Sequence, residues 1–209
     1  MFTARTLWEG RWPLGVLAVL SIAGWLWCWS AFALSFALLL FTLWFFRDPE
    51  RTPPQDPLAL VAPADGRVTD IQAGTDGTQT LGIFLSVFDV HVQRAPLDGV
   101  IADVRYEPGK FHDARDARAS TENEKRTIVL ESADGYRLVV RQIAGLIARR
   151  IVGWKEAGNL VQRGERIGMI RFGSRVELTL PVGTEITARV GQHVKGGETI
   201  VARRPAAAR

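Results

Sequence analysis

Residues 170–181 read IRFGSRVELTLP and contain the Gly173-Ser174 pair around which we interpret the chain. From Arg175 to Leu180 polar and apolar side chains alternate, which predicts a strand with one buried face. A Gly-Ser pair is common by chance, so the pair alone indicates nothing. Its meaning depends on which other reactive side chains the fold brings to the start of that strand.

The chain from Leu58 onward has the pattern of a β protein. Short apolar or alternating runs are separated by Gly, Pro and an Asp134-Gly135 pair that predicts a hairpin turn. We therefore expect residues 58–209 to form a mainly β domain, either a compact β-sandwich or a barrel-like sheet. The candidate strands are Gly66–Ile71, Thr80–Ser86, Gly99–Tyr106, Lys125–Glu131, Tyr136–Ile143, Arg166–Ile170, Arg175–Leu180, Glu185–Val190 and Thr199–Ala202.

The N-terminal part predicts a membrane anchor. Residues 12–46 carry no charged side chain, a run that is long for one bilayer-spanning helix and short for two. Arg5 and Arg11 precede it, and Arg47 and Arg51 follow it. Because basic residues stay on the cytoplasmic side, we expect residues 1–46 to form a hydrophobic helical hairpin in the cell (inner) membrane, with the β domain that follows in the cytoplasm. A single tilted span is the alternative.

Four prolines in residues 47–57 predict a Pro-rich linker between anchor and body. Within the body, residues 157–168 resemble residues 188–200, and such paired hairpins are similar to biotinyl or lipoyl carrier modules. A non-catalytic, membrane-tethered carrier is therefore an alternative function. However, Lys195 approaches a turn and does not occupy the hairpin tip where a carrier lysine would be modified.

Composition narrows the partners and cofactors. The net charge is +4, but the basic residues are scattered and form no aromatic-interleaved patch, so we expect no nucleic acid partner. The single cysteine, Cys28, and the absence of histidine pairs at metal-ligand spacing predict no metal site.

Three segments carry candidate reactive side chains. Asp65 lies in the segment APADG, Asp89 and His91 lie in VFDVHVQRAP, and Ser174 begins the strand quoted above. Because each lies at the end of a strand-like run, loops could bring a carboxylate, an imidazole and a serine together as an activated hydroxyl. An Asp-Gly turn and a structural histidine remain the alternative interpretations. His112 and His193 lie in polar, turn-like contexts typical of surface residues.

These segments, together with PGKF at 108–111, NEKR at 123–126 and GLIARRIV at 145–152, resemble the phosphatidylserine decarboxylase family, most of all its short bacterial form. The resemblance runs from about Arg47 to Ala202. There are three departures. Arg94 stands where longer members carry a second histidine, Phe172 replaces a leucine before Gly-Ser, and Lys125 follows Asn-Glu where many members have arginine.

The resemblance implies a pyruvoyl-dependent proenzyme. Asp65 would orient His91, and His91 would take the proton from the Ser174 hydroxyl. The chain would then cleave itself between Gly173 and Ser174 into a β chain of residues 1–173 and an α chain of residues 174–209. Ser174 would become the covalent pyruvoyl cofactor. After cleavage His91 would be the proton donor, assisted by Asp89.

The resemblance also implies the substrate. The pyruvoyl group would form a Schiff base with phosphatidylserine in the membrane and release CO2, giving phosphatidylethanolamine for phospholipid biosynthesis. Arg94, Arg149 or Arg150 could hold the lipid phosphate or the carboxylate. The αβ heterodimers could pair as dimers. A related lipid such as archaetidylserine, or a soluble amino-acid-type substrate, is the alternative.

Overall fold

The computed structural model describes residues 2–146, 150–171 and 173–206. The chain divides into two compact units, Met1–Glu50 and Arg51–Arg209. The second unit begins inside the Pro-rich segment, because Arg51 forms ion pairs with Asp65 at 2.7 Å and with Glu198 at 3.0 Å. The later part of the expected linker is therefore docked on the body.

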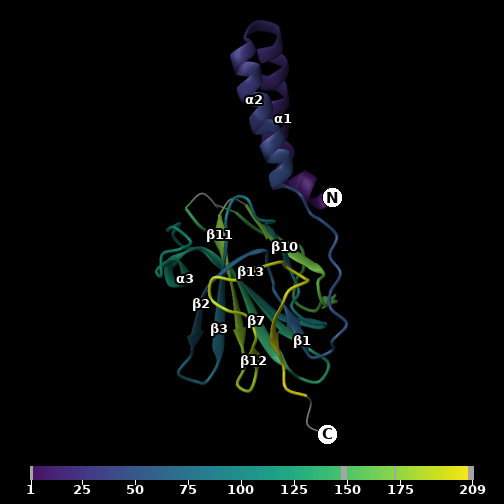
Figure 1. The fold of residues 1–209 in the computed structure, drawn as a ribbon, viewed down its shortest axis with the longest axis vertical. Helices are drawn as coiled ribbons and strands as arrows, with labels where there is room; N and C mark the ends of the chain where they lie inside the picture. The colour runs from purple at the N-terminus through teal and green to yellow at the C-terminus, as the bar shows by residue number, and fades with distance from the viewer. Residues whose placement is uncertain (1, 147–149, 172, 207–209) are drawn as a thin grey trace. The chain divides into compact units, whose positions relative to one another are not determined.

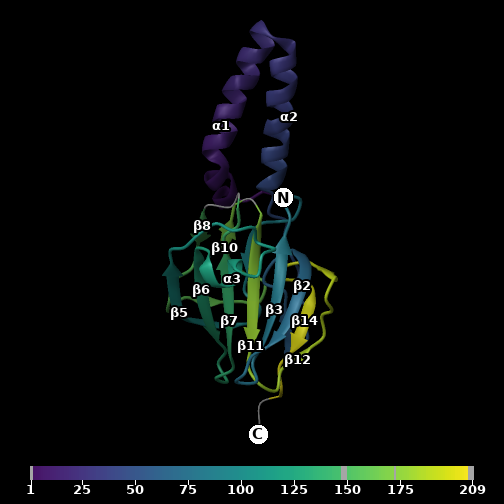
Figure 2. The same cartoon turned by 90° about the vertical axis from the view of Figure 1, so that its left-hand side faces the viewer.

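The first unit is a pair of helices, α1 (Ala4–Trp27) and α2 (Trp29–Phe45), lying side by side (Figures 1 and 2). The helices separate at Cys28, whose backbone is extended with φ −157° and ψ 104°. Gly24 allows their close approach, since a Cβ added there would lie 2.5 Å from the backbone nitrogen of Phe32. The apolar run thus forms two helices and not one.

The expected membrane-spanning anchor is not supported. Among the described residues, no helix combines the length and the apolar character needed to cross a membrane. Cys28 divides the apolar run into helices of 24 and 17 residues, and the first turns of α1 carry Arg5, Glu9 and Arg11.

The second unit is mainly β, as predicted, and its largest sheet curls into a half-barrel (Figure 2). This sheet is antiparallel, with the strand order β13-β2-β3-β11-β7-β6-β5-β9. Its strands are β2 (Gly66–Ala73), β3 (Gln79–Leu85), β5 (Gly99–Glu107), β6 (Lys125–Glu131), β7 (Arg137–Ile143), β9 (Leu160–Val161), β11 (Ser174–Leu180) and β13 (His193–Val194).

Two smaller antiparallel sheets and one short helix complete the body. One sheet has the order β1-β14-β12 and the other has the order β4-β10-β8. Their bounds are β1 (Ala59–Val61), β4 (Val92–Arg94), β8 (Ile151–Gly153), β10 (Arg166–Ile170), β12 (Glu185–Ile186) and β14 (Ile200–Arg203), and the helix is α3 (Ala119–Glu122).

The strand predicted over Glu185–Val190 is wrong beyond Ile186. Thr187 and Ala188 both donate their N–H groups to the carbonyl of Val201, which a regular ladder does not allow, and a turn follows at Gly191 with φ 88°. The other predicted strands lie within two residues of those in the structure. The strands that the sequence did not predict, such as β4 and β13, are only two or three residues long.

The two similar segments form turns of the same type. Gly164 and Gly197 both have φ 80°, a conformation that glycine adopts without strain. After each glycine a glutamate N–H bonds back three residues, Glu165 to Gln162 at 2.9 Å and Glu198 to Lys195 at 3.2 Å. The sequence similarity therefore reflects a repeated turn.

Candidate active site

Neighbouring strands of the large sheet begin or end at one edge, and most candidate residues lie there. The register places Ser174 of β11 opposite Leu85 at the end of β3, and Arg175 opposite Ile143 at the end of β7. β2 begins beside the end of β3. Residues 62–66, 86–91, 144–146 and 173–174 therefore meet at this edge although they are far apart in sequence (Figure 2).

Ser174 is the first residue of the central strand β11 and is fully buried. Its side chain shares the core-facing side of the strand with Val176 and Leu178. Within the described parts of the chain, its Oγ has no hydrogen-bond partner. Such a hydroxyl costs roughly 1–3 kcal/mol of desolvation, and unsatisfied buried groups are often found at catalytic positions.

Gly173, the residue before Ser174, is held on two sides. Gly173 adopts φ 63°, a left-handed conformation suited to glycine. Its N–H donates to Nε2 of His91 at 3.2 Å. Its carbonyl oxygen lies against the backbone of Gly145, because a Cβ added at Gly145 would lie 2.3 Å from that oxygen. The carbonyl that Ser174 would attack thus lies in close contact with the main chain at residue 145.

His91 is fully buried, and its hydrogen bonds define its tautomer. Nδ1 lies 2.9 Å from the main-chain carbonyl of Asp89, so Nδ1 carries the proton and donates it. Nε2 accepts from Gly173 and is therefore the unprotonated nitrogen. A neutral histidine with its basic nitrogen directed at Gly173 is suited to act as a general base there.

A buried chain of amides holds the backbone of His91. The His91 carbonyl accepts from Nε2 of Gln93 at 2.9 Å and from the N–H of Ile170 at 3.2 Å. Gln93 in turn accepts from Nε2 of Gln142 at 2.7 Å. Neither glutamine stands out in the sequence as part of a site, because only the fold shows that the two side chains face each other.

The carboxylate of Asp89 organises the loop before His91. It accepts from the N–H of Ser86 at 2.8 Å, from the hydroxyl of Ser86 at 2.7 Å and from Nε2 of His193 at 2.9 Å. Asp89 contacts His91 through its main-chain carbonyl. His193, expected at the surface, is 56% exposed and also belongs to this cluster.

Asp65 lies in a separate buried cluster. Its carboxylate pairs with Arg51 at 2.7 Å and accepts from the N–H of Gly196 at 2.8 Å. Burial raises the pKa of Asp65, although Arg51 and Gly196 partly offset this rise. No hydrogen bond or ion pair joins Asp65 to His91 in the described part of the chain, so the structure brings His91 to Gly173 but not Asp65 to His91.

Arg94, which replaces the second histidine of longer family members, is buried and donates from Nη1 to the carbonyl of Gly164 at 2.9 Å. Its positive charge also lowers the pKa of Asp65, although burial remains the larger effect. Arg94 therefore supplies positive charge to the Asp65 cluster and does not line the cavity next to Gly173 described below.

We expect Arg51→Met to destabilise the body by about 3 kcal/mol, because one partner of a buried ion pair is removed. Without Arg51 the pKa of Asp65 rises further. A raised folded-state pKa stabilises the fold at low pH, and this stability is lost as the pH rises towards that pKa. Urea unfolding should therefore show that Arg51→Met loses more of the wild-type free energy of unfolding at about pH 8 than at about pH 5.5.

The double variant Arg51→Met with Asp65→Asn is the control for this pH dependence, since it lacks the titrating carboxyl. Its loss of stability should not vary over the same pH range. An equal loss at both pH values for Arg51→Met alone would contradict the assignment of the effect to Asp65.

Asn123 connects two segments beside Gly145. Its side chain is buried, and Nδ2 donates to the carbonyls of His112 at 2.9 Å and of Ala144 at 2.8 Å. Its Oδ1 accepts from the N–H of His112 at 2.8 Å. Because all its contacts are to main chain, Asn123 fixes the backbone that precedes Gly145. This explains an asparagine at the start of the NEKR segment.

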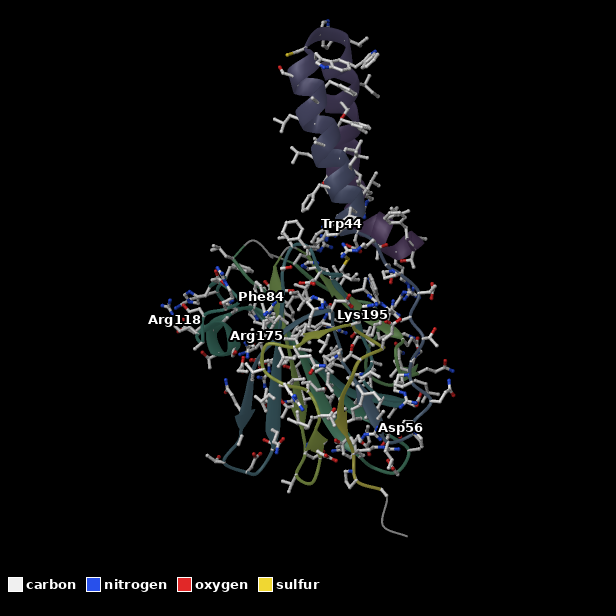
Figure 3. All side chains as sticks on the ribbon, viewed as in Figure 1. Trp44, Asp56, Phe84, Arg118, Arg175 and Lys195 are labelled. Carbon is white, nitrogen blue, oxygen red and sulfur yellow. The ribbon has the colours of Figure 1, made fainter. Side chains whose placement is uncertain are left out.

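Arg175 holds the start of β11 from the outer face of the sheet, close to Phe84 on the neighbouring strand (Figure 3). It pairs with Asp70 at 2.8 Å and with Glu177 at 2.9 Å. Gly82 makes room for it, since a Cβ there would lie 2.2 Å from Nη2 of Arg175. The residue after Ser174 is therefore anchored by side-chain contacts as well as by the sheet.

A cavity of about 400 Å³ adjoins the Gly173-Ser174 bond. Part of its wall comes from the end of β3 and part from the segment before α3, where Arg115 pairs with Asp113. The lining residues are Phe84, Ser86, Val87, Asp113, Ala114, Arg115, Leu146 and Gly173. Arg149 lies outside the described residues, so its expected contact with substrate is not described.

A buried serine without a hydrogen-bond partner among the described residues follows a glycine that contacts His91 and lines a cavity, and this combination makes the end of the sheet a candidate active site. A family model described as phosphatidylserine decarboxylase matches residues 38–202. The chain is 51% identical over 173 residues to the phosphatidylserine decarboxylase proenzyme of Citrifermentans bemidjiense, covering 80% of this chain and 79% of that protein.

The corresponding proenzyme of Trichlorobacter lovleyi is 50% identical over 175 residues, which cover 82% of this chain and 80% of that protein. The chain belongs to the phosphatidylserine decarboxylase family and is a decarboxylase. Membership of an enzyme family at this level of identity argues against the alternative of a non-catalytic carrier module.

Proposed function

We propose that this chain is a proenzyme that cleaves its own Gly173-Ser174 bond and then decarboxylates phosphatidylserine with a pyruvoyl group derived from Ser174. The observation that carries the proposal is the buried Oγ of Ser174, which has no partner among the described residues and follows Gly173, whose N–H is bound by His91. Like the relatives named above, the chain would be made as an inactive precursor.

In the cleavage step the Oγ of Ser174 attacks the carbonyl carbon of Gly173. Nε2 of His91 is the nearby unprotonated nitrogen, and it takes the hydroxyl proton once its contact with the Gly173 N–H is released. The amide becomes an ester between Gly173 and Ser174, and the Ser174 nitrogen gains a proton. Loss of the Ser174 α-proton and rupture of the Cβ–Oγ bond then release Gly173 as a carboxylate and leave residue 174 as dehydroalanine.

Water next replaces the nitrogen of residue 174, ammonia leaves, and a pyruvoyl group remains. This group supplies a ketone that condenses with the substrate amine and takes up the electron pair released with CO2. The sheet keeps residue 174 in place, since β11 pairs with both β3 and β7. His91 remains beside it as the candidate proton donor.

The same pairing explains how the two products would stay together. The α chain of residues 174–209 would contribute β11 to the middle of the large sheet and β14 to the middle of a smaller one. The β chain of residues 1–173 would supply both neighbours of β11, which are β3 and β7, and one neighbour of β14, which is β1. We therefore expect the αβ heterodimer to persist without a covalent link.

Mass spectrometry of the purified protein tests the proposal. The 23.1 kDa chain should appear as two chains cut between residues 173 and 174, with no free amine at the start of the smaller one. Decarboxylation of phosphatidylserine by protein that remains a single uncut chain would contradict the proposal.

We also propose that the α1–α2 hairpin attaches the protein to the cell (inner) membrane by lying in the lipid interface. Both helices expose large apolar side chains, including Trp12 at 72% and Trp27 at 83%. Tryptophan favours the membrane interface, and Arg11 and Arg47 would favour anionic lipid. This proposal requires no helix that crosses the bilayer.

Vesicle flotation tests this attachment. The intact protein should float with vesicles, and Trp27→Asp together with Trp29→Asp should reduce the floating fraction, because both side chains are exposed. Leu160→Asp, an exposed apolar position of the body, is the matched control. Equal flotation of all three proteins would contradict a role of the hairpin.

A further inference from the structure

A second cavity, of about 470 Å³, lies next to the one that Gly173 lines. The two cavities share Phe84 and Ser86, so they are neighbours at the end of the sheet where β3 ends and β11 begins. The remaining lining residues of the second cavity are Arg67, Phe88, Asp89 and His193. A substrate that reaches residue 174 through the first cavity can therefore extend into the second.

Arg67 is the arginine of this second cavity. Its side chain is exposed, and within the described residues the guanidinium makes no hydrogen bond or ion pair. The acid of the cavity, Asp89, already accepts hydrogen bonds from Ser86 and His193. In the first cavity the corresponding cation, Arg115, is neutralised by two contacts with Asp113 at 3.0 and 2.6 Å.

The register fixes how far Arg67 lies from the reactive position. Arg67 is opposite Phe84, and Ser174 is opposite Leu85, the next residue of the strand between them. Two strand spacings of about 4.8 Å place the two α-carbons roughly 10 Å apart. In a phosphoserine headgroup four bonds separate nitrogen from phosphorus, about 5 Å. Arg67 lies on the outer face of the sheet with Phe84, whereas Ser174 lies on the core face with Leu85. The headgroup would therefore pass around the end of β3 to reach both.

We propose that Arg67 binds the phosphodiester of the substrate headgroup while the headgroup amine reaches residue 174. A guanidinium suits a phosphate because it can donate two parallel hydrogen bonds. Phe88, which is 65% exposed in the same cavity, would contact the apolar part of the lipid beyond the phosphate. This assignment rests on the proposed function, since it takes residue 174 as the partner of the amine.

The test is steady-state kinetics of Arg67→Gln with phosphatidylserine in neutral detergent micelles. We expect KM to rise about tenfold and kcat to stay within about twofold, because the phosphate contact contributes equally to the ground and transition states. The KM of Arg67→Lys should lie between those of the wild type and Arg67→Gln, since an ammonium keeps the charge without the paired donors. Cleavage into two chains, followed on a gel, should be complete in each variant.

Arg105→Gln is the matched control, because it removes one exposed positive charge from β5, which is five strands away from β2 in the sheet. An unchanged KM in Arg67→Gln, or an equal rise in Arg105→Gln, would overturn the proposal. Inhibition by inorganic phosphate tests whether the site binds the phosphate group itself. Weak competitive inhibition of the wild type that Arg67→Gln reduces supports a general phosphate site, and inhibition that is equal in both proteins contradicts it.

Failure of the proposed function gives a different result from failure of the Arg67 site. If Ser174 is not the reactive residue, the wild-type protein is not cut between residues 173 and 174, whatever the KM of Arg67→Gln. If only the Arg67 assignment is wrong, the wild type and Arg67→Gln are both cut and have the same KM.

Discussion

Ser174→Ala should remain a single chain of 23.1 kDa and should not decarboxylate phosphatidylserine. The variant lacks the Oγ that attacks the Gly173 carbonyl, and it cannot form the pyruvoyl group. Self-cleavage and decarboxylation should both fall below detection, because Ser174 supplies the hydroxyl at the start of β11. Mass spectrometry and release of CO2 from carboxyl-labelled phosphatidylserine measure the two effects.

This variant should still fold, which makes its inactivity informative. In the described parts of the chain the Ser174 hydroxyl makes no hydrogen bond, so alanine leaves no buried group without a partner. Ser132→Ala is the matched control, since its hydroxyl bonds to Asp134 in a turn far from the edge that holds Ser174. Cleavage between residues 173 and 174 in Ser174→Ala would contradict the mechanism.

The sequence predicted the long strands well and the short ones poorly. Lys125–Glu131 and Arg166–Ile170 have the predicted bounds, because alternation or an apolar run marks a strand of five residues or more. β4 and β13 have only three and two residues, too few for a pattern. The apolar N-terminal run predicted a helical hairpin, and the structure has two helices that separate at Cys28.

The candidate site shows the same division. Ser174 and His91 could be proposed from sequence because each lies at the end of a strand-like run, where sites form. The partner of Asp65 could not be proposed from sequence, because Arg51 lies in a segment that was expected to be a linker. Asp89 contacts His91 through a main-chain carbonyl, which any residue type could supply. Gly145 was part of a motif, but its role follows only from its contact with the Gly173 carbonyl.

Gly145→Ala should slow self-cleavage by about 100-fold while leaving the chain folded. The added methyl group would lie 2.3 Å from the Gly173 carbonyl oxygen, so that carbonyl must move by roughly 1 Å to restore normal contact. A displacement of this size at a reacting group costs about 100-fold in rate. The time course of appearance of the two chains, followed on a gel after synthesis, measures the effect.

Gly145→Ala tests the steric contact without backbone strain. Residue 145 is not among the glycines with positive φ, so alanine suits its backbone. Overpacking should cost about 1–3 kcal/mol, which urea unfolding of the uncut chain can measure. Gly15→Ala is the matched control, since a Cβ there meets nothing within 4 Å, and it should be cut at the wild-type rate. Normal cleavage of Gly145→Ala would show that the carbonyl reaches its reactive position without the support of residue 145.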